Sequence, residues 1–304
     1  MTRLDPVRLF VRLAEELPTR LRAHVVIVGS LAAAYAFREK LTGGAVNTKD
    51  ADVVVHPAGD AASCRLMATR LLEAGWRRKE NCRPSPRSRP ATALDAIRLY
   101  PPEHQDYFVE LLGVSRAGQQ QKKAWLPIRL SDGWYGLPQF QFMRLALQGR
   151  RRAVEGIEYA SPAMLALSNL LAHASIGPET MSTLYRGRQV RRAAKDLGRV
   201  LALAFLAGRV GTEGWSGEWV RALRACFPTS WRRLVSRAGP GLRELLSDAS
   251  LLEEAWVTMD EGLLSGLDVT VADLRDVGAR LEVDVLDPLS RRLSAGARRN
   301  RMPP

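Results

Sequence analysis

A chain of 304 residues exceeds the usual size of a domain with one hydrophobic core, so its length favours two domains. Its 45 Lys and Arg outnumber 32 Asp and Glu, and the formal charge of +13 favours a polyanionic partner, with nucleic acid as the first candidate. An arginine-rich proteome is the alternative explanation. Three cysteines without CxxC spacing argue against a disulfide framework or a zinc site, and no apolar run reaches the roughly 20 residues that span a bilayer. We therefore expect a soluble cytoplasmic protein without a membrane partner.

The first quarter of the chain predicts alternating helices and strands. A helix over residues 5–17 begins at an Asp-Pro pair, which suits the N-cap and first helical positions. The run HVVIVG at 24–29 is typical of a buried strand, and its final Gly leads through Ser into a helix of good helix formers. After a Gly-rich loop, KDADVVVHP predicts a short strand ended by Pro57. A helix over 60–74 then ends at Gly75, a C-cap residue.

The next segments predict the rest of a sheet. Residues 77–90 are rich in Arg, Pro and Ser without an apolar period, which predicts a mobile or ligand-ordered loop. Residues 94–100 and 106–113 predict paired strands, and 126–130 predict a further short strand. A helix is expected around 138–148.

From about residue 150 the pattern becomes helical, with Gly and Pro between amphipathic or buried helices. We expect an α/β (α+β) domain over 1–150 and an all-α domain over 151–304 that closes a cleft and ends in a basic tail. Positive charge gathers in five clusters, Arg77-Arg78-Lys79, Arg83/Arg87/Arg89, Arg150-Arg151-Arg152, Arg186/Arg188/Arg191/Arg192 and Arg298/Arg299/Arg301.

Two carboxylates open the predicted strand after the Gly-rich loop. Asp50 and Asp52 are two residues apart, so they project from the same face of a strand at about 7 Å from each other. Carboxylates in this arrangement suit Mg²⁺, a hard ion that clamps the attacking and leaving oxygens in phosphoryl or nucleotidyl transfer. The alternative is a solvated strand entry.

A second motif lies about twenty residues upstream. Gly29 and Ser30 stand at the mouth of a helix, whose unpaired N–H groups and positive dipole end favour phosphate. Glycine permits close approach of the phosphate, and Ser30 adds a hydroxyl donor. A plain glycine turn into a core helix is the alternative for this motif alone, but the order strand, Gly-Ser, helix, Thr-Lys-Asp-x-Asp, strand is far more specific than either half.

In VGSLAAA and NTKDADVVV the sequence resembles the polymerase-β-like nucleotidyltransferase superfamily of the AbiEii and MenT toxin type, whose signature is hG[GS]…[ST]KDxDhhh. The resemblance spans roughly 24–206 and implies a mixed sheet with flanking helices, two aspartates on one strand and a third carboxylate on an adjacent strand. Glu110 is the candidate for the third, because an unpaired carboxylate in the apolar strand YFVELLG is costly. Asp106 and Asp95 are the reserves. A solvent-facing Glu on an edge strand is the alternative.

The helical half carries further matches and one departure. SPAMLALSNLLAH and RRAAKDLGRVLAL resemble two helices of the family, in which the Lys-Asp pair, here Lys195 and Asp196, helps to organise the site. Asn169 stands where the family usually has a lysine that contacts the nucleotide phosphates, and a neutral amide does not replace a cation. Lys195, Arg191 or His173 are the nearby substitutes.

The resemblance implies a Mg²⁺-dependent enzyme that transfers a nucleotidyl group from an NTP to tRNA or another nucleic acid, as in toxin-antitoxin or phage-defence systems, with a possible cognate antitoxin as protein partner. One alternative is an antitoxin-like or regulatory protein with the same fold that binds without catalysing. Another is an antibiotic-modifying nucleotidyltransferase, which the basic composition disfavours. The expected catalytic and metal-binding residues are Asp50, Asp52 and Glu110, and the expected nucleotide-binding residues are Gly29, Ser30, Thr48, Lys49, Lys195 and Asp196.

Overall fold

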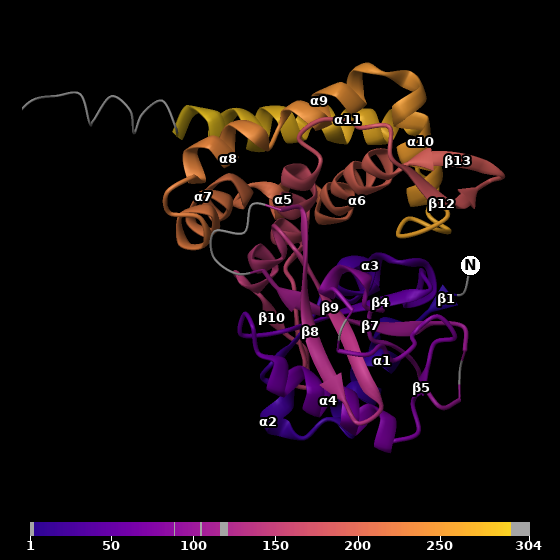
Figure 1. Cartoon of the computed structure of the whole chain (residues 1–304). Helices are drawn as coiled ribbons and strands as arrows, with labels where there is room; N and C mark the ends of the chain where they lie inside the picture. Colours follow the sequence, from indigo (N-terminus) through magenta and orange to yellow (C-terminus); the bar gives the residue numbers. More distant parts are fainter. Residues whose placement is uncertain (1–2, 88, 104, 116–120, 293–304) are drawn as a thin grey trace, which may run out of the picture. The chain divides into compact units, whose positions relative to one another are not determined.

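The computed structural model describes residues 3–87, 89–103, 105–115 and 121–292 (Figure 1). The chain divides into two compact units, the first comprising 1–39 and 43–161 and the second 40–42 and 162–304. The basic tail expected at 298–301 lies outside the described residues. None of the helices in the described ranges combines the length and the apolar composition that a bilayer crossing requires.

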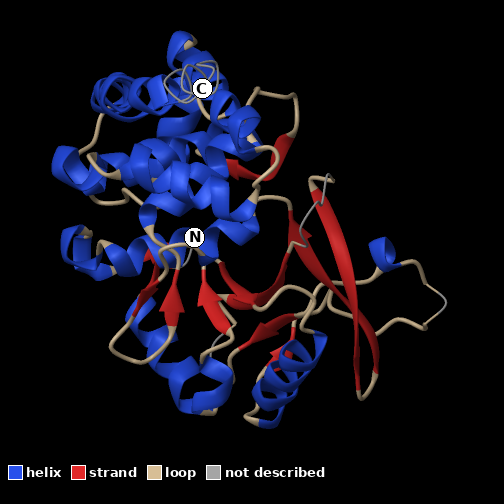
Figure 2. Cartoon of the chain, turned by 90° about the vertical axis from the view of Figure 1, so that its left-hand side faces the viewer, coloured by secondary structure: helices blue, strands red, loops and turns tan. Residues whose placement is uncertain are grey.

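The first unit is built on a mixed sheet. Its central strands run in the order β2 (Val25–Ile27), β4 (Asp50–Val55), β7 (Phe108–Val114), β6 (Arg98–Tyr100) and β5 (Arg77–Arg78). β4 and β7 are parallel, and the other neighbours in this series are antiparallel. The strands are the red arrows in Figure 2. The expectation of a mixed α/β architecture is thereby confirmed.

Four more strands extend this sheet. β10 (Arg151–Arg152) pairs with β11 (Glu158–Tyr159), which adds to β2 in parallel. The first unit therefore continues to residue 161, beyond the boundary expected near 150. β9 (Gly133–Phe140) pairs with β7 and with β8 (Lys123–Leu130).

The helices of the first unit follow local signals. Asp5 caps α1 by accepting a hydrogen bond from the Val7 amide at 2.9 Å, and Asp60 caps α4 through the Ser63 amide at 2.9 Å. Gly75 follows α4 with φ of 90°, the left-handed conformation expected of a terminating glycine. The helical elements are α1 (Pro6–Glu16), α2 (Thr19–Arg22), α3 (Gly29–Ala36) and α4 (Ala61–Glu73), with short 3-10 turns η1 (Arg38–Lys40), η2 (Thr42–Gly44), η3 (Ala91–Ala93) and η4 (Met143–Leu147). A separate pair, β1 (Arg3–Leu4) and β3 (Val46–Asn47), is antiparallel.

Two sequence expectations for the first unit are wrong. The helix expected around 138–148 is the end of strand β9 followed by the 3-10 turn η4, because β9 is held along its length by β8. The loop expected over 77–90 is partly joined to the sheet. It begins as β5, and Ser85 exchanges two backbone hydrogen bonds of 3.0 Å with Trp134. Ser88 lies outside the described residues.

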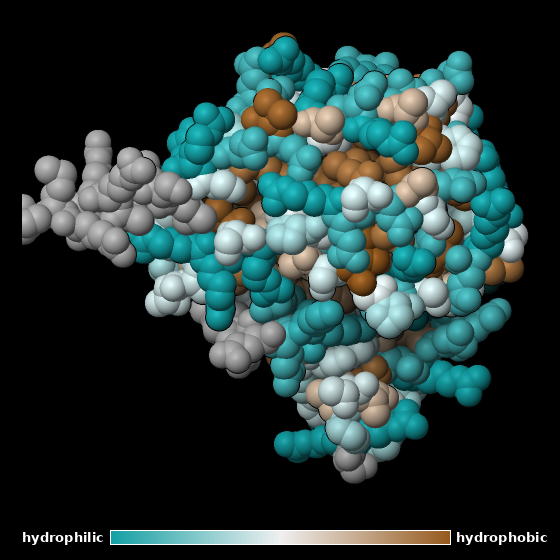
Figure 3. All heavy atoms as spheres, turned by 90° about the horizontal axis from the view of Figure 1, so that it is seen from above, coloured by the Kyte–Doolittle hydropathy of each residue, from teal (hydrophilic) through white to brown (hydrophobic). Residues whose placement is uncertain are grey.

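The second unit is largely helical, as expected, although it includes an unexpected hairpin of β12 (Thr180–Tyr185) and β13 (Arg188–Arg191). Trp219 is fully buried and donates its indole N–H to the Ala163 carbonyl at 2.8 Å, which ties α7 to α5. On the face shown in Figure 3, hydrophilic side chains predominate and apolar ones are interspersed. Its helices are α5 (Pro162–Ala172), α6 (Arg192–Thr212), α7 (Trp215–Cys226), α8 (Trp231–Arg237), α9 (Pro240–Ser247), α10 (Ala249–Asp260) and α11 (Val271–Leu281), and a π-helical turn η5 (Glu282–Leu286) follows.

Candidate functional site

The first turn of α3 lies against one of the two predicted aspartates. Gly29 has φ of 70°, which glycine adopts without steric cost, and a Cβ at this position would lie 2.8 Å from Oδ2 of Asp52. The Val28 amide also donates to the Asp52 carbonyl at 3.0 Å. The N-cap is Val28, whose apolar side chain has no group to bond the first N–H groups of the helix. The Asp52 carboxylate thus sits beside a helix end that favours negative charge.

Asp50 is held by the residue two positions before it. The hydroxyl of the buried Thr48 lies 3.1 Å from the Asp50 carbonyl oxygen and 3.1 Å from Asp50 Oδ1. The same hydroxyl therefore restrains both the main chain and the side chain of Asp50. The neighbouring Lys49 is exposed, and its carbonyl accepts a hydrogen bond from the Phe108 amide at 2.9 Å. Thr48, Lys49 and Asp50 are therefore anchored to the adjacent strand β7, with the Asp50 carboxylate exposed to solvent.

Glu110 lies in the same row as Asp52. In the parallel pair of β4 and β7, Asp52 is opposite Glu110, and in the antiparallel pair of β7 and β6, Glu110 is opposite Arg98. Residues opposite one another project from the same face of a sheet. β7 lies between β4 and β6, so the edge-strand interpretation of Glu110 is wrong.

The Glu110 carboxylate is engaged by a residue that the sequence did not single out. Nε of Arg98 donates to Glu110 Oε2 at 2.8 Å, and the Glu110 side chain is 14% exposed. Burial opposes the charge of Arg98, but the hydrogen bond and charge of Glu110 outweigh it and raise the pKa of Arg98 above its ordinary value. The ion pair therefore favours the charged form of Arg98 in this row.

A second cation near these carboxylates is Lys79, which the sequence indicated only as part of a basic cluster. Its ammonium lies 3.7 Å from the centroid of the Phe108 ring, and its amide donates to the Arg98 carbonyl at 2.9 Å. Burial and the nearby Arg98 lower the pKa of Lys79, whereas Asp50 and Glu110 oppose the shift. The Lys79 ammonium is therefore close enough to interact electrostatically with the carboxylates of Asp50 and Glu110.

The three carboxylates predicted to bind Mg²⁺ have different surroundings in the structure. Within the described part of the chain, no group of three or more His, Cys, Asp or Glu is gathered so as to hold a metal ion. Mg²⁺ is commonly held by one or two carboxylates together with waters and substrate phosphates, so the oxygen donors of Asp50 and Asp52 fit it. Glu110, the expected third ligand, is in the ion pair with Arg98.

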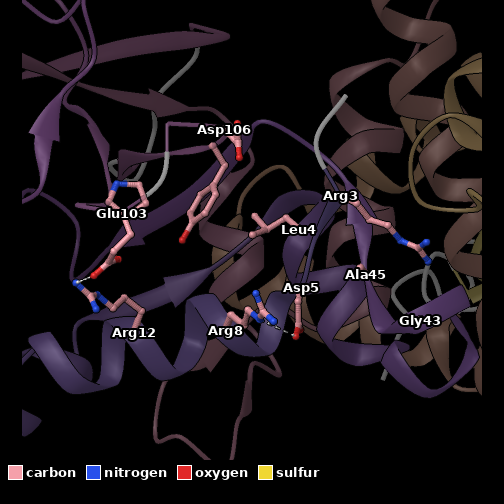
Figure 4. Close-up of a pocket in the computed structure, with 11 residues that line it drawn as sticks. Arg3, Leu4, Asp5, Arg8, Arg12, Gly43, Ala45, Glu103 and Asp106 are labelled. Atoms are coloured by element: carbon pink, nitrogen blue, oxygen red, sulfur yellow. Dashed lines mark ion pairs between the residues drawn. The ribbon is translucent and has the colours of Figure 1, made fainter.

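The two reserve carboxylates lie elsewhere. Asp95 accepts a hydrogen bond from the Arg83 amide at 3.1 Å. Asp106 lines a pocket of about 580 Å³ in the first unit, which includes none of Asp50, Asp52 and Glu110. Figure 4 shows ion pairs at this pocket, Arg12 with Glu103 and Arg8 with Asp5, at 3.2 and 3.9 Å. Arg8 and Arg12 of the pocket lining thus have acidic neighbours of their own.

In the second unit, Asp196 joins two helices. His173 Nε2 lies 2.9 Å from Asp196 Oδ2, and Arg199 lies 3.7 Å from the other oxygen. Burial raises the pKa of Asp196, but the His173 hydrogen bond and Arg199 outweigh this and lower it overall. Lys195 is half-buried on the same helix. The visible role of Asp196 is therefore to link α5 and α6.

The backbone carbonyl of Asn169 accepts the His173 amide at 3.1 Å, a bond that does not depend on the side chain at this position. Among the suggested substitutes for the family lysine, His173 bonds Asp196 and Arg191 lies 3.8 Å from Glu254. Both are thus engaged within the second unit.

Two further arginines of the hairpin, and Arg192 at the start of α6, also have acidic partners. Their partners are Asp260 for Arg186, Glu253 for Arg188 at 2.9 Å and Glu179 for Arg192 at 2.8 Å.

Comparisons with known proteins add little. No protein-family model matches the chain, and no curated protein matches it. The crystal structure of JHP933 from Helicobacter pylori is similar over 98% of this chain and 98% of that one, with 12% identity and a TM-score of 0.42. A similarity this weak identifies neither family nor function.

Proposed function

We propose that the chain is a Mg²⁺-dependent nucleotidyltransferase with a polymerase-β-like catalytic unit, which transfers a nucleotidyl group from an NTP to a nucleic acid. The observation that supports this most is the contact between Gly29 and Asp52, with Asp50 on the same face. It sets an anion-binding helix end beside two hard oxygen donors, the combination that a metal-bound triphosphate requires.

The residues have separate tasks in this proposal. Asp50 and Asp52 would hold Mg²⁺, which when bound stabilises charge on the attacking and leaving oxygens. The N–H groups at the start of α3 and the Ser30 hydroxyl receive the phosphates, while Thr48 orients Asp50 through its two hydrogen bonds. The exposed Lys49 adds a positive charge beside them. Lys195 and Asp196 remain predicted nucleotide contacts from the resemblance.

The direct experiment is transfer of label from α-³²P NTPs to total RNA in the presence of Mg²⁺. We expect wild-type protein to transfer label and Asp50→Ala and Asp52→Ala to lose transfer. Their melting temperatures without Mg²⁺ should not fall, because removing one of two close carboxylates relieves repulsion. Asp268→Ala, which removes an exposed carboxylate of the second unit, should transfer normally. Undiminished transfer by Asp50→Ala would rule out its metal role.

A second candidate is a protein of this fold that binds nucleotide without catalysis. Asn169 in place of the family lysine favours it, as does the engagement of Glu110 by Arg98. In that case Mg²⁺·NTP stabilises the protein, by about 2.7 kcal/mol at a hundred times the dissociation constant, but no label is transferred. Stabilisation together with label transfer excludes this candidate.

A further inference from the structure

A basic and aromatic surface adjoins the carboxylates on one face of the sheet. It consists of Lys79, Arg98, Tyr100 and Phe108, and we call it the basic-aromatic face. The Phe108 ring is at its centre, with Arg98 Cζ 5.9 Å and the Tyr100 ring 6.1 Å from its centroid, the two rings being nearly perpendicular at 89°. All four residues are only partly buried, and the Arg98 side chain is 37% exposed.

The strand order fixes where this surface lies. Asp50 and Asp52 are on β4, with β2 and the start of α3 on one side and β7, β6 and β5 on the other. The carboxylates therefore lie between an anion-binding helix end and the basic-aromatic face. In displacement at phosphorus, the attacking and leaving groups are roughly in line on opposite sides. If the leaving phosphates occupy the start of α3, the acceptor approaches from the side of the basic-aromatic face.

The chemistry of the surface selects among acceptors. Its positive charge suits backbone phosphates, at Lys79 more than at Arg98, which is paired with Glu110. Its rings suit unpaired bases, whose stacking on aromatic side chains is tolerant of sequence. A cationic small molecule would meet like charge at Lys79 and Arg98. A duplex would not offer the faces of its bases to Phe108. The exposed Arg83 and Arg87 follow Lys79 in the chain and continue the positive charge.

We propose that the basic-aromatic face binds the single-stranded end of a nucleic acid acceptor, with a phosphate on Lys79 and a base on Phe108. The acceptor role rests on the proposed nucleotidyltransferase function, but the binding does not. In that reaction the terminal hydroxyl oxygen forms a bond to the α-phosphorus and releases its proton to solvent. The bond from the α-phosphorus to the bridging oxygen breaks, and pyrophosphate leaves with the electron pair.

The test is fluorescence anisotropy with a labelled single-stranded RNA of about 12 nucleotides, within the usual range of such sites, without Mg²⁺ or NTP. We expect Phe108→Leu and Lys79→Gln each to weaken binding about fivefold or more, and the same RNA in a duplex to bind less tightly than the single strand. Phe140→Leu is the matched control. Phe140 is 38% exposed on β9 and has Lys123 5.5 Å from its ring, so it is a cation-aromatic pair away from the carboxylates. Its loss should leave affinity unchanged.

In the anisotropy measurement, either of two results would overturn the proposal: unchanged affinity in both Phe108→Leu and Lys79→Gln, or an equal loss in Phe140→Leu. Melting temperature with Mg²⁺·NTP is the second measurement, and we expect both face variants to keep the wild-type shift. Loss of that shift with RNA binding intact would assign the face to the nucleotide and overturn the proposal. If wild-type protein neither transfers label nor responds to NTP, yet binds RNA through Phe108, the nucleotidyltransferase function fails and the binding face stands.

Discussion

Gly29 is the residue at which backbone conformation and the candidate site constrain each other directly. Its positive φ costs an L-residue about 1–2 kcal/mol, and a Cβ would also press on the Asp52 carboxylate at 2.8 Å. We predict that Gly29→Ala lowers the free energy of unfolding by more than Gly149→Ala does, as measured in urea. Gly149 has a comparable φ of 58°, but the nearest atom to its Cβ is 4.0 Å away. Equal losses in the two variants would mean that the Asp52 side chain moves away from the added Cβ without a loss of stability.

His56 gives the first unit a predictable pH dependence. Burial lowers the pKa of His56, and the nearby charges of Arg150 and His24 lower it further. Glu158 and Asp60 raise the pKa, but each has a smaller effect than Arg150. Nε2 of His56 is buried without a hydrogen-bond partner among the described residues. Because the folded pKa lies below the ordinary value of about 6.5, the unfolded chain takes up the proton first as pH falls. This stability is fully present above that value and is lost as pH falls towards the folded pKa.

We therefore predict that His56→Gln flattens the fall in the free energy of unfolding between about pH 7 and pH 5, a window set by the ordinary histidine pKa. Urea unfolding of both proteins at several pH values measures this. If wild-type and variant lose stability in parallel, His56 is not the responsible group, and the other histidines become the candidates.

How far the candidate site was predictable depends on sequence distance. Thr48, Lys49, Asp50 and Asp52 form one short motif, so their placement follows from a single strand entry. Arg98 was not identified, and Lys79 was identified only as part of a basic cluster. Their approach to Glu110 and Phe108 depends on the pairing of β5, β6 and β7, which no local pattern specifies. The alternation in Arg98-Leu99-Tyr100 was the available signal. It shows a strand with one polar face, but not which neighbours that face meets.

At the scale of elements, the predicted helices are correct where local capping and periodicity determine the structure. The predictions are wrong where pairing between strands determines it. α1 and α4 begin directly after their capping aspartates, as their sequences indicate. The last residues of β9 were included in a predicted helix because the segment that follows, Met143–Leu147, consists of good helix formers, whereas β8 and β7 hold the strand extended. The hairpin of β12 and β13 was missed because it is mostly exposed, and its few buried side chains pack with Val257 of α10.

The start of α11 carries the clearest capping box of the second unit. The Thr270 amide donates to Asp273 Oδ2 at 2.8 Å, and the Asp273 amide donates to the Thr270 hydroxyl at 3.2 Å. We predict that Thr270→Ala lowers the free energy of unfolding by about 1 kcal/mol, the usual effect of losing such a cap. Ser230→Ala is the control, since Ser230 is the N-cap of α8 but its side chain makes no capping bond. Similar effects of the two substitutions on urea unfolding would show that the box contributes nothing.

At the scale of the whole molecule, the basic residues behind the formal charge of +13 differ in whether acidic residues lie beside them. Arg186 and Arg188 of the hairpin and Arg192 of α6 lie beside acidic residues of α10 and of the segment before β12, so much of their charge is satisfied internally. The cluster of Arg83, Arg87 and Arg89 has a different setting. Arg87 lies 6.0 Å from the Trp134 ring centroid and Arg89 donates to the Ser85 hydroxyl at 3.2 Å, contacts that leave the charges available to an anion. In the sequence both clusters are simply concentrations of positive charge, whereas the structure shows that their surroundings differ.

This difference leads to a prediction about the salt dependence of RNA binding. Each phosphate contact that a protein makes releases counterions, so affinity falls with salt at a slope set by the number of contacts. We predict that replacing Arg83, Arg87 and Arg89 together with Gln flattens that slope by up to about 3 units, one for each lost contact. The matched control replaces Arg186, Arg188 and Arg192 with Gln. It removes the same net charge, so a general loss of positive field would affect both variants alike, whereas a loss of direct phosphate contacts would affect only the first. Gel-shift titrations of one tRNA at several salt concentrations measure the slopes. Identical slopes for the first variant and wild type would exclude that loop from the interface, and an equal change in the control would show that net charge alone governs binding.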